Sequence, residues 1–88
     1  MQDVNKIKLM NVLGSIVKKH RISRGKTIYK ISAESSISKS AWREIEIGAC
    51  KDINLSTLWK ISEGLEMPIT ELIEELKNKI GDDFSLID

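Results

Sequence analysis

The sequence predicts an all-α fold in which five short helices form one compact domain. Apolar residues recur at steps of three and four, which is the spacing of one helix face, and no strand-like alternation is sustained. Ser, Thr or Asn stands immediately before several of these segments, where its side chain can cap a helix. Connections of about two to six residues, several of them marked by Gly or Pro, separate the segments.

The first predicted helix runs from about residue 5 to residue 23. Its apolar face carries Ile7, Met10, Leu13 and Val17. Asp3 and Asn5 are the two candidates for its N-cap. Gly25 follows its end, at a position where glycine is the preferred residue.

Two shorter helices are predicted over about residues 28–35 and 39–47. Thr27 and Ser38 stand at their N-cap positions, and Gly48 stops the second helix. A turn of about three to four residues joins them, so together they form a helix-turn-helix pattern. In such a pattern the second helix presents its N-terminal residues to base edges in the major groove of DNA.

The last two helices are predicted to begin near Leu55, with Asn54 as N-cap, and at Pro68, which suits the first position of a helix. Their apolar faces consist of Leu58, Ile61 and Leu65 in the first and Ile69, Leu72, Ile73 and Leu76 in the second. We expect residues 1–76 to form the domain and residues 77–88 to form a C-terminal tail.

The net charge is +1, but the two halves of the chain differ in sign. Residues 1–44 hold ten Lys or Arg against three acidic residues, a net charge of +7, and residues 45–88 hold four against ten, a net charge of −6. Such a chain can present a basic face to an anionic partner while it stays near neutral overall. The alternative is that these charges form ordinary solvated helix faces.

Composition and motifs argue against an enzyme, a metalloprotein and a membrane protein. The single cysteine, Cys50, allows neither an intramolecular disulfide nor a multi-cysteine zinc site, and no cofactor or metal is expected. No Gly-rich phosphate loop, nucleophile elbow or HExxH motif is present. No apolar run approaches the ~20 residues that span a bilayer, and no signal-peptide core is visible. We therefore expect a cytoplasmic protein of bacterial or phage type.

The segments resemble, in their order and spacing, the lambda-repressor-like, Xre-type helix-turn-helix family. Three fragments resemble the family's Thr/Ser-Gln-Glu-Glu-Leu-Ala run, its Val-Ser-x-x-x-Ile stretch and its Ile-Glu-x-Gly signature, and they are residues 27–32, 37–42 and 45–48. The resemblance implies a five-helix DNA-binding domain that acts as a dimeric transcriptional regulator. It also implies an ion pair between Arg21 and Glu46, which ties the first helix to the third and orients the recognition helix.

Two sets of residues are predicted to contact DNA. In the recognition helix, residues 39–47, the predicted base contacts are Lys39, Ser40, Ala41, Arg43 and Glu44. Lys and Arg suit the acceptors of guanine, Ala can touch a thymine methyl group, and Glu can accept from the cytosine amino group. The predicted phosphate contacts are Lys26, Thr27, Tyr29, Lys30, Lys51 and Asn54. Thr27 and Asn54 have a second interpretation as helix caps alone, and the lysines as ordinary surface residues.

The sequence thus predicts a homodimeric regulator, a repressor, that binds specific sequences in double-stranded DNA. The predicted dimer interface consists of Ile73, Leu76, Ile80, Phe84, Leu86 and Ile87. Alternatively, the tail folds back on its own domain.

A second hypothesis is a protein-interaction module on the same fold, such as an antitoxin-like or phage-regulator component. Ile28, Ile47 and Glu44 depart from the family's pattern and favour this alternative. Trp42 and Trp59 are interpreted as core or half-buried packing residues, because a stacking platform for single-stranded nucleic acid needs exposed aromatic rings beside a basic groove.

Overall fold

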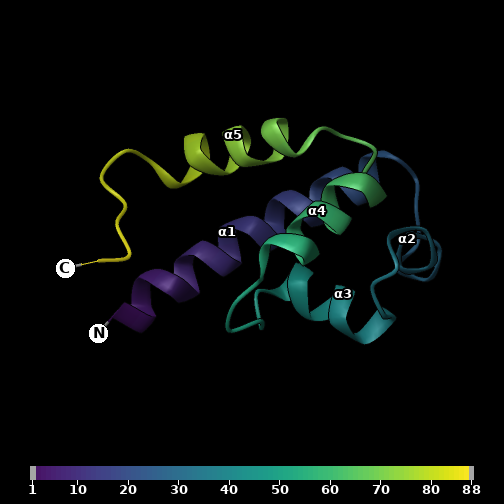
Figure 1. Ribbon diagram of the computed structural model, residues 1–88, viewed down its shortest axis with the longest axis horizontal. Helices are drawn as coiled ribbons and strands as arrows, with labels where there is room; N and C mark the ends of the chain where they lie inside the picture. Colours follow the sequence, from purple (N-terminus) through teal and green to yellow (C-terminus); the bar gives the residue numbers. More distant parts are fainter. Residues whose placement is uncertain (1, 88) are drawn as a thin grey trace.

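Five helices and no strand are present in the computed structural model, which describes residues 2–87 (Figure 1). The helices are α1 (Gln2–Ser23), α2 (Ile28–Ser35), α3 (Lys39–Ile47), α4 (Leu55–Gly64) and α5 (Ile69–Ile80). The all-α class is confirmed, and α2 and α3 have the predicted bounds. α1 begins earlier than predicted, so Asp3 and Asn5 lie within the helix and do not occupy an N-cap position.

α1 is the central helix of the molecule. It has 22 residues, and at a rise of 1.5 Å per residue its length of roughly 33 Å covers most of the 39 Å long axis. α3 packs on one side of α1 and α5 on another (Figure 1). α2 packs against α3 and α4, and α4 also packs against α5. The pair α2 and α3 is therefore supported by α1 and by α4.

Two glycines allow helices to approach each other closely. A Cβ atom on Gly14 of α1 would lie 2.4 Å from the carbonyl oxygen of Ile45 in α3. A Cβ atom on Gly64 of α4 would lie 2.8 Å from the Cβ of Ser35 in α2. Any larger residue at either position would force the two helices apart, so both glycines contribute to the placement of the α2–α3 pair.

The core draws apolar side chains from all five helices, and Trp42 is its largest fully buried residue. The predicted face of α1 is buried except for one residue, and Ile16 is buried as well. Ile7 is 57% exposed, contrary to the prediction. It lies beside the loop that follows α3.

Local hydrogen bonds define where three helices begin. Thr27, Ser38 and Asn54 each accept a bond from the backbone N–H three residues further on, at 3.0, 3.1 and 2.8 Å. All three predicted N-caps are therefore confirmed. Pro68 occupies the N-cap position of α5 and not its first helical position, so this helix begins one residue later than predicted.

After α5 the chain turns back and ends beside the start of α1 (Figure 1). The side-chain amide of Asn5 donates to the carbonyl oxygen of Ser85 at 2.8 Å. α5 continues to Ile80, which is buried, and an irregular segment follows it.

Candidate nucleic-acid interface

The turn between α2 and α3 sets the direction of α3. Ser36 adopts a left-handed conformation with φ 60° and ψ 32°. Its N–H and the N–H of Ile37 both donate to the carbonyl oxygen of Ser32. The side chain of Ile37 is buried in the core. Hydrogen bonds therefore hold one side of the turn, and packing holds the other.

α3 has two faces of different composition. Its buried face consists of Trp42, Ile45 and Glu46. Its exposed face consists of Lys39, Ser40, Arg43, Glu44 and Ile47. Ala41 is partly buried against the core, so it is the least accessible of the five predicted base contacts. Ile47 is 66% exposed and is not among the predicted contacts, although its spacing of four residues from Arg43 puts both on one side of the helix.

A hydrogen-bonded ion pair anchors the buried face of α3 to α1. Arg21 donates to both carboxylate oxygens of Glu46, from Nε and, at 3.0 Å, from Nη2. Its Nη1 donates to the carbonyl oxygen of Lys26 at 2.8 Å. Trp42 Nε1 donates to the same carboxylate at 2.7 Å. The hydrogen bond to Glu46 raises the pKa of Arg21, although burial acts in the opposite direction. This is the pair that the family resemblance implies.

Tyr29, a predicted phosphate contact, and Lys39, a predicted base contact, lie close together. Tyr29 of α2 is 71% exposed. The ammonium nitrogen of Lys39, the first residue of α3, lies 5.0 Å from the centroid of the Tyr29 ring. That distance is within the ~6 Å range of a cation–π interaction. Lys30, the next residue of α2, is also exposed.

Lys26 is partly buried and bound by neighbouring groups, unlike the other predicted phosphate contacts, which are exposed. Its side chain is 10% exposed. The ammonium group donates to Glu34 at 2.7 Å and to the carbonyl oxygen of Gly64 at 3.1 Å, and Glu66 lies 3.5 Å away. The hydrogen bond to Glu34 raises the pKa of Lys26. Lys26 therefore joins the start of α2 to the end of α4, and its phosphate contact stays a prediction that requires it to leave these partners.

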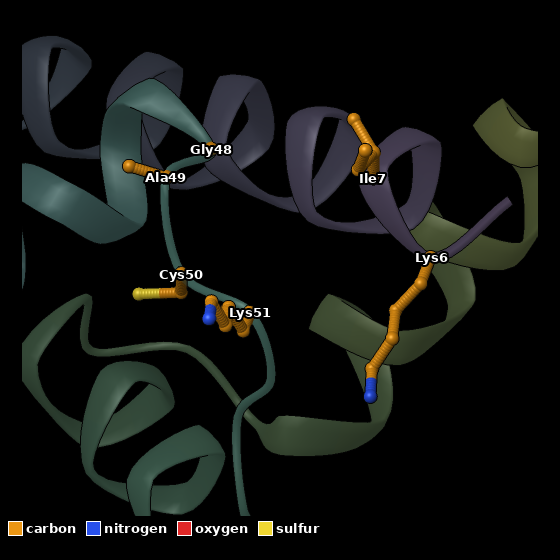
Figure 2. Close-up of a pocket in the computed structure, with 6 residues that line it drawn as sticks. All are labelled: Lys6, Ile7, Gly48, Ala49, Cys50 and Lys51. Carbon is orange, nitrogen blue, oxygen red and sulfur yellow. The ribbon is translucent and has the colours of Figure 1, made fainter. Parts of the chain in front are cut away.

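The loop between α3 and α4 lies beside the first turns of α1. Lys6 and Ile7 of α1 and residues Gly48–Lys51 of the loop line one hollow (Figure 2). Lys6 forms an ion pair with Asp52 at 3.0 Å, which ties the loop to α1. Lys51 is exposed and pairs with no acidic side chain between residues 4 and 87.

Cys50 is a partly buried thiol in the same loop. Burial and the nearby carboxylate of Glu44 raise its pKa. In Figure 2 its sulfur turns away from Lys6 and Ile7. The thiolate is the reactive form of cysteine, so this thiol is less reactive at neutral pH than an unperturbed one.

Two large apolar side chains of α4 are exposed. Leu55 is 71% exposed and Trp59 is 51% exposed. Their spacing of four residues puts them on one side of the helix. Trp59 is therefore half-buried at most, whereas Trp42 lies fully in the core.

The six predicted dimer residues have different environments within the chain. Ile80 is buried, and Leu76 and Phe84 are partly buried. The three exposed members are Ile73, Leu86 and Ile87.

Across the described part of the chain, no three His, Cys, Asp or Glu side chains are arranged to hold a metal ion. No helix between residues 2 and 87 has the length and apolar character needed to cross a membrane.

α2 and α3 are joined by a short turn, and α3 exposes a polar face. The other three helices support this pair, and such an arrangement is typical of helix-turn-helix proteins. The chain carries an Xre-like helix-turn-helix domain. SlrR of Bacillus subtilis (strain 168), an HTH-type transcriptional regulator, is 33% identical over 63 residues, which are 72% of this chain and 41% of that regulator. The chain thus spans less than half the length of SlrR. No protein-family model matches the sequence.

Two solved structures are similar to this fold. A mutant of the restriction-modification controller protein C.Esp1396I matches with a TM-score of 0.75 and 25% identity, over 82% of this chain and 92% of that chain. The clp gene regulator ClgR from C. glutamicum matches with a TM-score of 0.73 and 19% identity, over 83% of this chain and 94% of that chain.

Proposed function

We propose that the protein is a transcriptional regulator that binds specific sequences in double-stranded DNA, with α3 in the major groove. The observation that carries this proposal is the polar exposed face of α3, opposite a face that Arg21 anchors to α1. Lys39 and Arg43 can donate to guanine, and Glu44 can accept from the cytosine amino group. The similarity to proteins described as regulators also supports the proposal.

Phosphate contacts come from the start of α2 and from the loop before α4. Helix N-termini present free N–H groups to anions, and Thr27 and Asn54 stand at two such ends. Four exposed cations of α2, α3 and the loop before α4 form no ion pair with any acidic side chain described between residues 4 and 87. They are Lys30, Lys39, Arg43 and Lys51. They are therefore available to phosphates and bases without first losing an acidic partner.

The regulator acts as a homodimer and a repressor in this proposal. Ile73 of α5 and Leu86 and Ile87 of the tail are exposed apolar residues, and in this proposal a second copy covers them. Two-fold symmetry then gives half-sites about one helical turn, ~34 Å, apart. Repression follows from occupancy, because a bound dimer blocks access to a promoter without any further contact.

Enrichment of random duplex DNA on the purified protein tests the function directly. At ~150 mM salt, weak binding through phosphates alone is largely screened. We expect a two-fold symmetric motif, whose half-site spacing follows from the dimer. A motif without symmetry would contradict the dimer, and no motif from folded protein would contradict specific DNA binding.

Sedimentation tests the dimer separately. We expect a dimer at high micromolar concentration, and Leu86→Glu together with Ile87→Glu should give a monomer that keeps its fold by circular dichroism. A wild-type monomer both with and without the enriched duplex would contradict dimerisation.

A protein-interaction module is the second candidate. The exposed Leu55 and Trp59 of α4, together with Ile47 of α3, favour it, because water-exposed side chains of this size often belong to interfaces. Under the DNA hypothesis, Lys39→Glu with Arg43→Glu abolishes duplex binding. Under this alternative, the wild type itself enriches no duplex motif and the charge reversal changes nothing.

A further inference from the structure

Tyr29 and Lys39 form a contact that joins the two helices of the helix-turn-helix. Tyr29 lies on the outer side of α2 with 71% of its surface exposed. The Lys39 ammonium nitrogen lies 5.0 Å from the centroid of its ring. Lys39 forms no ion pair with any acidic side chain between residues 4 and 87, so the ring is the group that holds its ammonium in place.

We infer that Tyr29 is a positioning residue that selects the bound orientation of Lys39 and so determines which base Lys39 prefers. The inference rests on the proposed DNA function. A lysine side chain is long and flexible, and it loses much rotamer freedom when it is held against one base. A partner that restricts the ammonium group before binding reduces that loss.

An aromatic ring suits this task better than a carboxylate. The ring attracts the cation through its electron-rich face. A carboxylate would instead accept hydrogen bonds from the ammonium group and compete with guanine for them. The three N–H donors of Lys39 remain largely free to bond the O6 and N7 atoms of guanine.

The ring and the hydroxyl group of Tyr29 therefore have separable roles. The ring holds Lys39, and the hydroxyl group is free to contact a phosphate. Tyr29→Phe keeps the ring and removes only the hydroxyl group. Tyr29→Leu removes the ring while it keeps an apolar side chain on an exposed helix position, so both variants should fold like the wild type.

A measurement without DNA tests the contact itself. In the proton NMR spectrum, the ring shields the protons on Cε of Lys39 and moves their resonance upfield. We expect the wild type and Tyr29→Phe to show this shift and Tyr29→Leu to lack it. Equal Lys39 resonances in all three proteins would overturn the inference, whatever the protein does with DNA.

Binding to the enriched duplex tests the consequence. Lys39→Ala first identifies the base pair that Lys39 reads, as the position where discrimination is lost. At that pair, Tyr29→Leu should lower discrimination by about two- to fivefold, the fold-change that an exposed cation–π contact corresponds to. Tyr29→Phe should keep the wild-type discrimination there. Lys30→Ala, one residue further along α2, should weaken all duplexes alike.

The outcomes separate the two proposals. If the wild type enriches no motif, the DNA function fails, and the inference fails with it even where the NMR shift is present. If a motif is found but Lys39→Ala or Tyr29→Leu leaves the base preference unchanged, only the inference fails. If Tyr29→Phe loses as much discrimination as Tyr29→Leu, the hydroxyl group and not the ring is responsible, and the inference is again overturned.

Discussion

Arg21 joins three parts of the molecule through one guanidinium group. Its backbone belongs to α1, two of its nitrogens hold Glu46 of α3, and the third holds the carbonyl oxygen of Lys26 at the entry to α2. Arginine suits this position because its planar group presents several donors in fixed directions. The pair is mostly shielded from water, with side chains 13% and 4% exposed. Replacing both partners by apolar residues costs little in such cases, whereas removing one leaves a buried charge without its partner.

We expect Arg21→Ala to lower the free energy of unfolding by about 3 kcal/mol, because Glu46 then keeps only the N–H of Trp42 as a partner. Urea denaturation at neutral pH measures this change. Lys18→Ala, an exposed position on the same helix, is the control and should change stability by less than about 0.5 kcal/mol. Similar small losses in both variants would contradict the anchoring role.

At the scale of the elements, two features hold helices in position: the turn between α2 and α3, and the hydrogen bonds of Glu75 between α5 and α1. The α2–α3 turn depends on Ser36, whose φ of 60° is a conformation that glycine adopts without strain. α5 is held on α1 by Glu75, which accepts hydrogen bonds from Lys19 and from Nε2 of His20. The N-caps and the apolar spacing of each helix do not by themselves fix how these helices lie relative to one another.

In the turn between α2 and α3, replacing Ser36 should increase the stability of the protein. Glycine at position 36 removes a left-handed strain of about 1 kcal/mol, and the greater freedom of the unfolded chain cancels part of the gain. We expect Ser36→Gly to stabilise the protein by about 0.5 kcal/mol, a rise in Tm of about 2–4 °C. Ser36→Ala, which keeps the strain, should not be stabilised. Thermal unfolding followed by circular dichroism gives both values, and a Tm for Ser36→Gly at or below the wild-type value would refute the argument.

The hydrogen bonds of Glu75 make the free energy of unfolding depend on pH. The hydrogen bond from Lys19, and then that from His20, lowers the pKa of Glu75 below its ordinary value of about 4.5. The unfolded chain therefore takes up the proton at a higher pH than the folded one. The stabilisation is complete above the ordinary pKa and is lost as the pH falls through the lowered one.

Unfolding free energies measured between pH 6 and pH 3 test this dependence. We expect Glu75→Gln to be less stable than the wild type near pH 6, and the difference to shrink as the pH falls. Glu74→Gln, an exposed neighbouring carboxylate, is the matched control. A difference between wild type and Glu75→Gln that stays constant over this range would contradict the assignment.

For the whole molecule, the charges are distributed so that a nearly neutral protein keeps free cations on its proposed DNA face. Several basic residues of the first half pair with acids of the second, as Lys6 does with Asp52 and Lys19 with Glu75. These pairs neutralise charge on α1 and join distant parts of the chain. The unpaired cations of the helix-turn-helix then make binding to DNA dependent on salt.

Measuring DNA affinity at several salt concentrations distinguishes lysines that contact phosphates from lysines that contact bases. Lys30→Ala should weaken binding to all duplexes alike and reduce the slope of log K against log salt by about 0.9. Lys39→Ala should change the base preference as well. Lys79→Ala, at the far end of α5, should leave slope and preference unchanged. If Lys79→Ala has the same effect as Lys30→Ala, the protein binds DNA through its total charge and not through this face.

The sequence by itself determined the helices and the helix-turn-helix. Thr27, Ser38 and Asn54 cap their helices through bonds that span only three residues, and the apolar spacing that buries Trp42 is equally local. Short-range signals of this kind are complete within a few residues of chain, so α2 and α3 were predicted with their observed bounds. The exposed face of α3, on which Lys39, Ser40, Arg43 and Glu44 lie, followed from the same periodicity.

Only the tertiary structure decided how the long side chains are used. Lys26 was predicted to reach a phosphate, yet its acceptors come from the end of α2 and from the end of α4. Tyr29 and Lys39 stand ten positions apart, and their contact depends on the angle of the turn between them. Ile7 fits the helix period but is 57% exposed. A flexible side chain has many possible partners along a sequence, and only the packing of distant segments selects one of them.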